Sequence, residues 1–199
     1  MTLVFLLFLP LNKLLGAGGM KRVFHCYLWG MKRERLEELA AQFVKEWLPR
    51  LTYPEIISEI EEHRAAGRRL VLSSASPELW VQHIGKALGF DLSLGTLFEW
   101  GDQVEFFPDL IGENHKGGAK VVRLADLGIT EGIEGYSDSR ADVPLLELCQ
   151  KQTLVNPLPS IKAEGADRGW RLLEPAKPWK NRFAFGWGCA LQLFGIWKP

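Results

Sequence analysis

The sequence predicts an α/β fold with a doubly wound, Rossmann-like and mainly parallel sheet. Strand-like and helix-like segments alternate between residues 69 and 156, a pattern typical of parallel sheets covered by helices on both faces. The chain has 199 residues, 47% of them hydrophobic, which is enough for one sizeable core with a small accessory part. In such sheets ligands lie beyond the carboxyl ends of the strands, so we expect a functional site there.

The first third of the chain is predicted to be helical. Apolar residues recur at spacings of three and four in residues 32–49, which indicates an amphipathic helix. Pro54 opens a second helix that ends near Gly67. We therefore divide the chain into a helical region at residues 1–68, an α/β core at 69–175 and an aromatic-rich tail at 176–199.

The α/β core begins with a short apolar strand at residues 69–73, followed by a helix from Pro77 that stops at Gly89. Residues 95–100 and 103–107 flank a turn at 101–102 and predict a β-hairpin. The later segments are predicted as a helix at 118–127, a strand at 133–136, a helix after Asp142 and a strand at 153–156.

The charge balance and the cysteine count exclude several classes of partner. Lys+Arg and Asp+Glu both number 24, so no net field draws the chain to nucleic acid, which we do not expect as a partner. The three cysteines show no C-x-x-C spacing and the four histidines are scattered, so neither a disulfide framework nor a zinc site is predicted. A cytoplasmic location fits this pattern.

Both ends of the chain are apolar. Residues 1–10 lack a preceding basic residue and are too short to span a bilayer, so we favour a helical piece that packs on a neighbour, or a segment whose context has been cut off. A signal peptide or an anchor is the alternative. The aromatic stretch at 183–197 follows three basic residues. We favour a helix packed on the core, and the alternative is a segment that lies in a membrane interface.

Small hydroxyl residues occupy the first strand end of interest. Ser74 and Ser76 lie in the loop between the strand and the helix that starts at Pro77. Backbone N–H groups and the helix dipole favour an anion at such a place, and phosphate would suit it. The alternative is that Ser76 merely caps the helix.

A glycine-bearing loop at residues 112–118 brings Lys116 and Lys120 to the start of a helix. Lysine in the first turn opposes the helix dipole, so an anion that needs neutralising would explain it. The alternative for at least one of the two lysines is a solvated surface position.

The third strand end carries two carboxylates. Asp138 follows the strand at 133–136, and Asp142 comes four residues later at the start of a helix. Asp138 could coordinate a hard cation directly, while Asp142 holds a ligand water or the loop; the alternative for Asp142 is a helix cap. The same stretch, Gly135-x-Ser137-x-Ser139, lacks the last glycine of a nucleophile elbow, and no histidine follows His115, so a serine hydrolase is not predicted.

In this order, the hydroxyl loop, the lysine loop and the segment from Gly135 to Asp142 resemble motifs two, three and four of the haloacid dehalogenase (HAD) superfamily of phosphatases. The resemblance is closest to the phosphoserine-phosphatase-like branch and covers roughly residues 30–175. It implies a HAD-type core with a helical cap in residues 1–68, and a small phosphorylated substrate such as phosphoserine.

The resemblance also implies a role for each residue. Ser74 would hydrogen-bond the transferring phosphoryl group, and Lys120 would neutralise it, with Lys116 as the second choice for the lysine. Mg²⁺ would be held by Asp138 and Asp142. Ser76 and Lys116 would contribute to substrate binding. Where the family usually has Gly-Asp-Ser, this chain has Tyr136-Ser-Asp-Ser139, so we align Asp138 with the first aspartate of that motif.

One departure from the family concerns the chemistry itself. The family's first motif, D-x-D-x-T, lies on the first strand, and its first aspartate is the nucleophile. In this chain the first aspartate is Asp91, beyond the second motif, so neither aspartate of that motif can be assigned. We expect the first strand to be missing, the chain to begin just downstream of the motif, and turnover to be nearly absent. The alternative is a degenerate HAD-fold protein that binds phosphate or a protein partner without catalysis.

Overall fold

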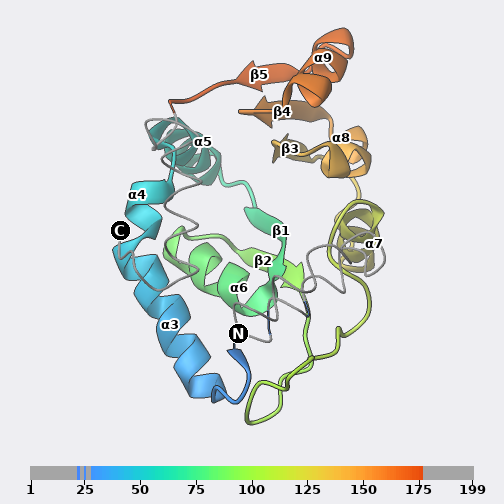
Figure 1. Cartoon of the computed structure of the whole chain (residues 1–199). Helices are drawn as coiled ribbons and strands as arrows, with labels where there is room; N and C mark the ends of the chain where they lie inside the picture. The colour runs from blue at the N-terminus through green and yellow to red at the C-terminus, as the bar shows by residue number, and fades with distance from the viewer. Residues whose placement is uncertain (1–21, 23–24, 26–27, 177–199) are drawn as a thin grey trace. The chain divides into compact units, whose positions relative to one another are not determined.

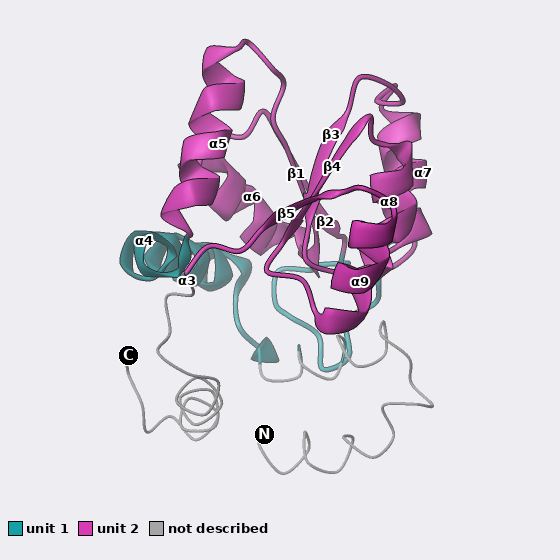
Figure 2. Cartoon of the chain, turned by 90° about the horizontal axis from the view of Figure 1, so that it is seen from above, with its two compact units in different colours: residues 1–52, 98–112, 177–199 teal, residues 53–97, 113–176 magenta. Residues whose placement is uncertain are grey.

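The computed structural model describes residues 22, 25 and 28–176. The chain divides into two compact units, which Figure 2 shows in different colours. Unit 1 comprises residues 1–52, 98–112 and 177–199, and unit 2 comprises 53–97 and 113–176. The apolar residues 1–10 and the aromatic stretch 183–197 lie outside the described residues, and the domain boundaries at 68/69 and 175/176 stay predictions.

Unit 1 contains helix α3 (Arg33–Glu46), the short helix α4 (Leu48–Leu51) and the loop 98–112. The predicted helix at 32–49 therefore ends at residue 46, and α4 begins with a proline in its first turn, where the missing N–H costs nothing. Leu36 and Ala40 form the buried face of α3, one turn apart.

The predicted hairpin with its turn at residues 101–102 is wrong. Residues 92–96 form part of a parallel pair, and Phe98 instead bridges Leu110 in the antiparallel sense, so a longer loop joins the two sides. Within that loop, Val104 N–H donates to Met31 O at 2.9 Å, and Gln103 bridges Lys32. The backbone partners of the second predicted strand thus come from a segment seventy residues away, which no local turn signal reveals.

The first sheet of unit 2 pairs two parallel strands, β1 (Val71–Pro77) and β2 (Leu92–Thr96). Helix α6 (Glu78–Ala87) connects them and packs on both. Gly89, with a φ of 70°, follows the helix in the left-handed region that glycine adopts at low cost. The predicted strand and helix are both present, but β1 extends to Pro77 rather than to residue 73, so Ser74 and Ser76 lie on the strand and not in the expected loop.

The second sheet of unit 2 has the order β3–β4–β5, all parallel, with β3 at Glu134–Ser137, β4 at Lys151–Val155 and β5 at Arg171–Leu173. The connections contain η3 (Arg140–Asp142), α8 (Val143–Leu148) and α9 (Pro159–Asp167). A fully buried cluster of Leu146, Leu154 and Ile161 joins α8, β4 and α9. The predicted α/β fold with a mainly parallel sheet is confirmed.

Two further helices complete unit 2. Helix α7 (Gly118–Asp126) precedes β3, and α5 (Pro54–Ala65) precedes β1. Within the described residues, β1 pairs only with β2, and β3 only with β4, so the parallel strands form two separate sheets (Figure 1). None of the described helices is long and apolar enough to cross a membrane.

Candidate functional site

A cavity of about 290 Å³ lies in unit 2 at the carboxyl ends of β1 and β3. The end of β1, the loop before α7 and the loop after β3 all contribute to its walls. Five of the six residues predicted for the site line this cavity, namely Ser74, Lys116, Lys120, Asp138 and Asp142. Ser76, the sixth, is exposed and is not among the lining residues.

Lys120 and Asp142 form the buried centre of the cavity wall. The Lys120 Nζ lies 2.8 Å from Asp142 Oδ1, and the two side chains are 6% and 11% exposed. The ammonium also donates to the main-chain oxygen of Ser73 at 3.2 Å. Because a lysine ammonium has three N–H donors, one donor remains to meet an anion in the cavity.

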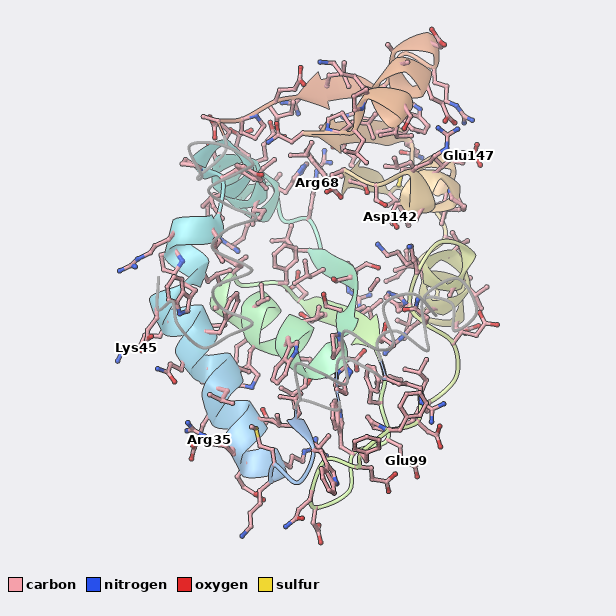
Figure 3. The ribbon with its side chains drawn as sticks, viewed as in Figure 1. Arg35, Lys45, Arg68, Glu99, Asp142 and Glu147 are labelled. Carbon is pink, nitrogen blue, oxygen red and sulfur yellow. The ribbon has the colours of Figure 1, made fainter. Side chains whose placement is uncertain are left out.

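The Asp142 carboxylate (Figure 3) is engaged at both oxygens. While Oδ1 accepts from Lys120, Oδ2 accepts from the Ser137 hydroxyl at 2.7 Å. Ser137 Oγ in turn accepts from Ser139 N–H at 3.1 Å, which closes the turn after β3. Asp142 occupies the N-cap position of α8, yet its side chain makes no capping hydrogen bond, because these partners hold the carboxylate towards the cavity.

The hydroxyl loop is arranged differently from a helix cap. Ser76 makes no side-chain cap to α6, whose N-cap residue is Pro77. Instead, Ser76 N–H donates to Ser74 Oγ at 3.2 Å, which orients the Ser74 side chain at the cavity. The Ser74 hydroxyl proton is then able to donate to a second acceptor.

Lys116 and Asp138 are the exposed members of the cavity wall. Together with Lys120 and Asp142 they give the cavity two positive and two negative formal charges, a net charge of zero. A phosphate dianion therefore gains little from the overall charge of the wall. A divalent cation that binds with the phosphate would make the site attractive to it.

The predicted Mg²⁺ ligands can be tested against this geometry. In the described part of the chain no group of three or more His, Cys, Asp or Glu side chains could hold a metal. Mg²⁺ nevertheless needs only one or two carboxylates when phosphate oxygens and waters complete its octahedron. Asp138 fits a direct ligand, whereas Asp142, with both oxygens engaged, fits the role of holding the loop.

Tyr136 forms another part of the wall and connects it to α5. Its hydroxyl donates to Glu59 Oε2 at 2.7 Å and lies 2.8 Å from His63 Nε2. Arg171 of β5 also donates to Glu59, at 2.8 Å through its Nη1. Hydrogen bonds from Arg171, and secondarily from Tyr136, lower the pKa of Glu59 to about 2, and burial raises the pKa of Tyr136.

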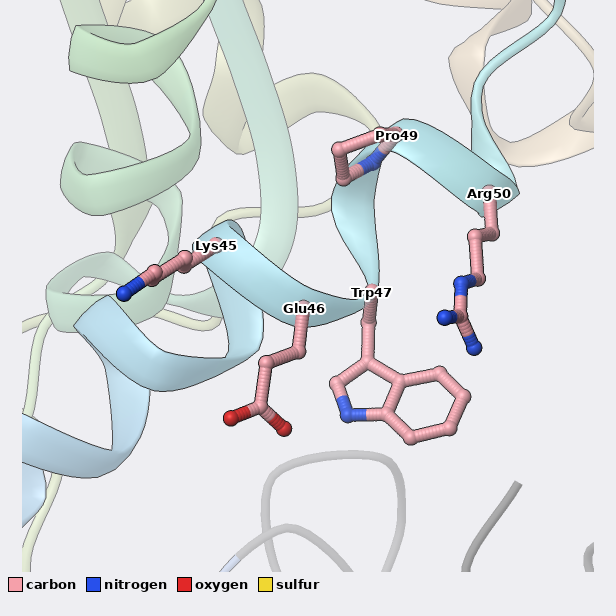
Figure 4. Close-up of a pocket in the computed structure, with 5 residues that line it drawn as sticks. All are labelled: Lys45, Glu46, Trp47, Pro49 and Arg50. Atoms are coloured by element: carbon pink, nitrogen blue, oxygen red, sulfur yellow. The ribbon is translucent and has the colours of Figure 1, made fainter.

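A second hollow, of about 380 Å³, lies in unit 1 where α3 meets α4 (Figure 4). Its walls come from one short stretch of chain, which includes Lys45, Trp47 and Arg50. The Arg50 guanidinium lies over the Trp47 ring, 5.6 Å from its centre. Although this hollow is larger, none of the predicted site residues lines it, whereas five of them line the cavity in unit 2. The unit 2 cavity is therefore the candidate site.

Sequence reasoning missed two residues that shape the cavity. The first is Ser137, whose bond to Asp142 could have been suspected from its place between Gly135 and Asp138. The other is His115, a buried residue whose Nε2 lies 2.9 Å from Ser73 Oγ. Nothing in the linear sequence distinguishes His115 from a surface histidine, because its partner is 42 residues away.

Comparison with known proteins shows which family the chain belongs to. The sequence model of haloacid dehalogenase-like hydrolases matches residues 2–147. The chain is 31% identical over 164 residues to the "Inhibition of morphological differentiation protein" of Streptomyces azureus, covering 77% of this chain and 56% of that protein. It is 31% identical over 134 residues to phosphoserine phosphatase SerB1 of Mycobacterium tuberculosis, covering 60% of this chain and 43% of that protein.

The chain thus spans about half the length of these curated relatives. Among solved structures, a probable phosphoserine phosphatase from Vibrio cholerae superposes with a TM-score of 0.66 at 12% identity, covering 99% of this chain and 58% of that one. At that identity the likeness concerns the fold. Since the family match extends over well more than half of the sequence, this chain belongs to the haloacid dehalogenase-like hydrolase family.

Proposed function

We propose that the unit 2 cavity is the phosphoryl-binding site of a Mg²⁺-dependent phosphomonoesterase for a small metabolite such as phosphoserine. The observation that carries this proposal is Lys120, a buried lysine that is held at a cavity wall by Asp142 and the Ser73 carbonyl. Burying an ammonium costs free energy unless the ammonium is paired. The third N–H of Lys120, which has no partner among Asp142 and the Ser73 carbonyl, is available to donate to an anion in the cavity. A cytoplasmic enzyme with a small soluble substrate fits this site.

Within the proposal each wall residue has a distinct task. Ser74 donates its hydroxyl to a non-bridging phosphoryl oxygen, and Lys120 donates its third N–H to another. Lys116, exposed at the rim, attracts the substrate or contacts its leaving group. Asp138 holds Mg²⁺, which when bound neutralises the charge of the phosphate, and Asp142 keeps Lys120 and the loop in place.

The sequence as written lacks the D-x-D-x-T motif that would supply the nucleophile and the general acid. Loss of a catalytic nucleophile costs on the order of a millionfold in turnover where residues act as a unit. We therefore propose that this polypeptide binds a phosphomonoester and hydrolyses it at most at a trace rate.

A second candidate function is a HAD-fold protein whose biological role is binding alone. It is favoured by the same sequence observation, since no aspartate of this chain can be assigned to the nucleophile position. In this case the chain binds phosphate or a protein partner, and no version of the natural polypeptide turns over.

The test is calorimetric titration of inorganic phosphate and O-phosphoserine, each with and without Mg²⁺. Under the proposal, phosphate binds more tightly with Mg²⁺, and Lys120→Met weakens phosphate binding by about ten- to a hundredfold, the loss of one hydrogen bond to a charged group. The matched control is Lys86→Met, which removes an exposed lysine of α6 and should leave binding unchanged.

Failure of wild-type protein to bind either compound at millimolar concentration would refute the proposed site. Assay of p-nitrophenyl phosphate with Mg²⁺ separates the two candidate functions when it is applied both to this chain and to a version extended upstream to include any in-frame D-x-D-x-T motif. Hydrolysis by the extended version that is lost in Asp138→Asn identifies the phosphatase, and phosphate binding without hydrolysis by either version identifies the binding protein.

A further inference from the structure

His115 is a buried side chain at the edge of the cavity that the proposed function does not use. It is 2% exposed, and its Nε2 lies 2.9 Å from the Ser73 hydroxyl on β1. Its own main-chain N–H donates to the hydroxyl of Thr96, at the end of β2, at 3.2 Å. One residue therefore ties the loop before α7 to both strands of the first sheet.

The Thr96 hydroxyl makes this attachment rigid. It is fully buried and lies 2.8 Å from the main-chain oxygen of Ala75, to which it donates, and 3.1 Å from Asn114 Oδ1. Ala75 and Ser73 both line the cavity. The anchor of the loop is thus built directly on the strand end that forms the cavity wall.

The loop that His115 anchors carries Lys116 and leads into the helix that carries Lys120. Lys116 follows His115 directly, and Gly117, with a φ of 60°, turns the chain into α7, whose third residue is Lys120. A lysine in the first turn is repelled by the helix dipole, so its inward position has to be imposed by neighbouring structure. Because only four residues separate His115 from Lys120, a shift of the loop would also move Lys120.

The opposite end of α7 has its own attachment. Arg123 donates to the Gly95 carbonyl at 2.8 Å and to Glu78 Oε2 at 2.7 Å. The helix is therefore fixed at both ends to the β1–α6–β2 unit, and His115 is the attachment nearer to the lysines. We infer that His115 is a positioning residue, which holds Lys120 at the cavity by fixing the loop 112–117 to β1 and β2.

The first experiment reads the position of Lys120 without any ligand. Amine acetylation followed by mass spectrometry measures the reactivity of each lysine in the folded chain. Lys120, with its side chain 6% exposed, should react slowly in wild-type protein, and His115→Ala should raise its rate about tenfold, the effect of losing one anchoring bond. The rate at Lys86 serves as the internal control and should not change.

A second variant, which leaves the His115 side chain in place, distinguishes loss of the hydrogen bond from unfolding of the chain. Ser73→Ala removes the same hydrogen bond from the β1 side, and circular dichroism confirms that the variant is folded. It should also raise the reactivity of Lys120. If Lys120 stays protected in a folded Ser73→Ala protein and in His115→Ala, the inference is overturned.

The second experiment rests on the proposed function and uses inorganic phosphate with Mg²⁺. His115→Ala should weaken phosphate binding about tenfold, and His115→Gln, which retains an N–H donor, should restore part of the loss. In a Lys120→Met background His115→Ala should have no further effect on binding while it still lowers stability. Additive losses of affinity would mean a general structural role and would refute positioning through Lys120.

The two experiments fail independently. If wild-type protein binds no phosphate, the proposed function fails, and the acetylation rates still decide whether His115 positions Lys120. If phosphate binds and Lys120 reactivity does not respond to His115, the proposed function stands and the inference falls.

Discussion

Replacing Lys120 by methionine would test how much the buried ion pair between Lys120 and Asp142 contributes to the stability of the chain. The substitution keeps an unbranched side chain and removes the charge, which leaves the Asp142 carboxylate, 11% exposed, with Ser137 as its remaining hydrogen-bond partner. Breaking a buried ion pair by removing one partner typically costs 3–5 kcal/mol, and the slight exposure of this pair places the expected loss at about 3 kcal/mol.

Thermal and urea unfolding measure this loss. At roughly 2–4 °C per kcal/mol for a chain of this size, the melting temperature should fall by about 10 °C. Lys151→Met provides the control, because its Nζ lies 2.8 Å from Glu134, the same separation as in the buried pair, with the lysine side chain 71% exposed. Exposed pairs contribute less than about 1 kcal/mol, so the control should shift the transition little.

A double-mutant cycle decides whether the effect belongs to the pair. Lys120→Met combined with Asp142→Leu replaces two buried charges by apolar groups, and should be more stable than Lys120→Met alone. If Lys120→Met costs no more than Lys151→Met, or if the double variant loses the sum of the single losses, the pair does not stabilise unit 2 and the reasoning fails.

Three further outcomes are expected. Asp138→Asn should remove the Mg²⁺-dependent gain in phosphate affinity measured by calorimetry while phosphate binding without Mg²⁺ is kept; an unchanged gain would exclude Asp138 as a ligand. Gly95→Ala should destabilise the chain by about 1–3 kcal/mol in urea unfolding, because its Cβ would lie 2.5 Å from Glu78 Cα; a neutral result would contradict the packing of α6 on β2. The pKa of Glu59 is lowered from 4.5 to about 2, mainly by Arg171, so its contribution to stability is complete above pH 4.5 and is lost as the pH falls towards 2. Arg171→Met should therefore reduce the acid-dependent loss of stability between pH 5 and pH 2 by on the order of 1 kcal/mol, given that solvent screens the pair; equal pH profiles would refute this.

Local sequence patterns predicted the elements that depend on neighbouring residues. Pro54 and Gly67 delimit α5, Pro77 and Gly89 delimit α6, and the apolar segments form β1, β3 and β4. The signals work here because proline fixes φ at a helix start and glycine accepts the left-handed conformation at its end. The hairpin prediction failed because the backbone partner of Gln103 is Lys32, and pairing over that separation leaves no trace in local composition.

The order of the hydroxyl, lysine and aspartate motifs predicted which residues gather in the cavity. Five of these residues line one cavity at the carboxyl ends of β1 and β3, although the two strands belong to separate sheets in the described part of the chain. Ser76 is the exception, because it is exposed and lies outside the lining residues, although strand alternation alone would place it on the same face as Ser74.

By itself, then, the sequence determined the fold class, through the alternation of strand-like and helix-like segments, and its motif order indicated the haloacid dehalogenase-like family. The same motifs supplied the candidate residues Ser74, Lys116, Lys120, Asp138 and Asp142. The tertiary structure decided their partners. That Asp142 binds Lys120 and Ser137 rather than capping α8, and that His115 anchors the lysine loop on β1, depends on packing between distant segments. Such contacts follow from the three-dimensional path of the chain, which brings side chains together irrespective of their separation in sequence.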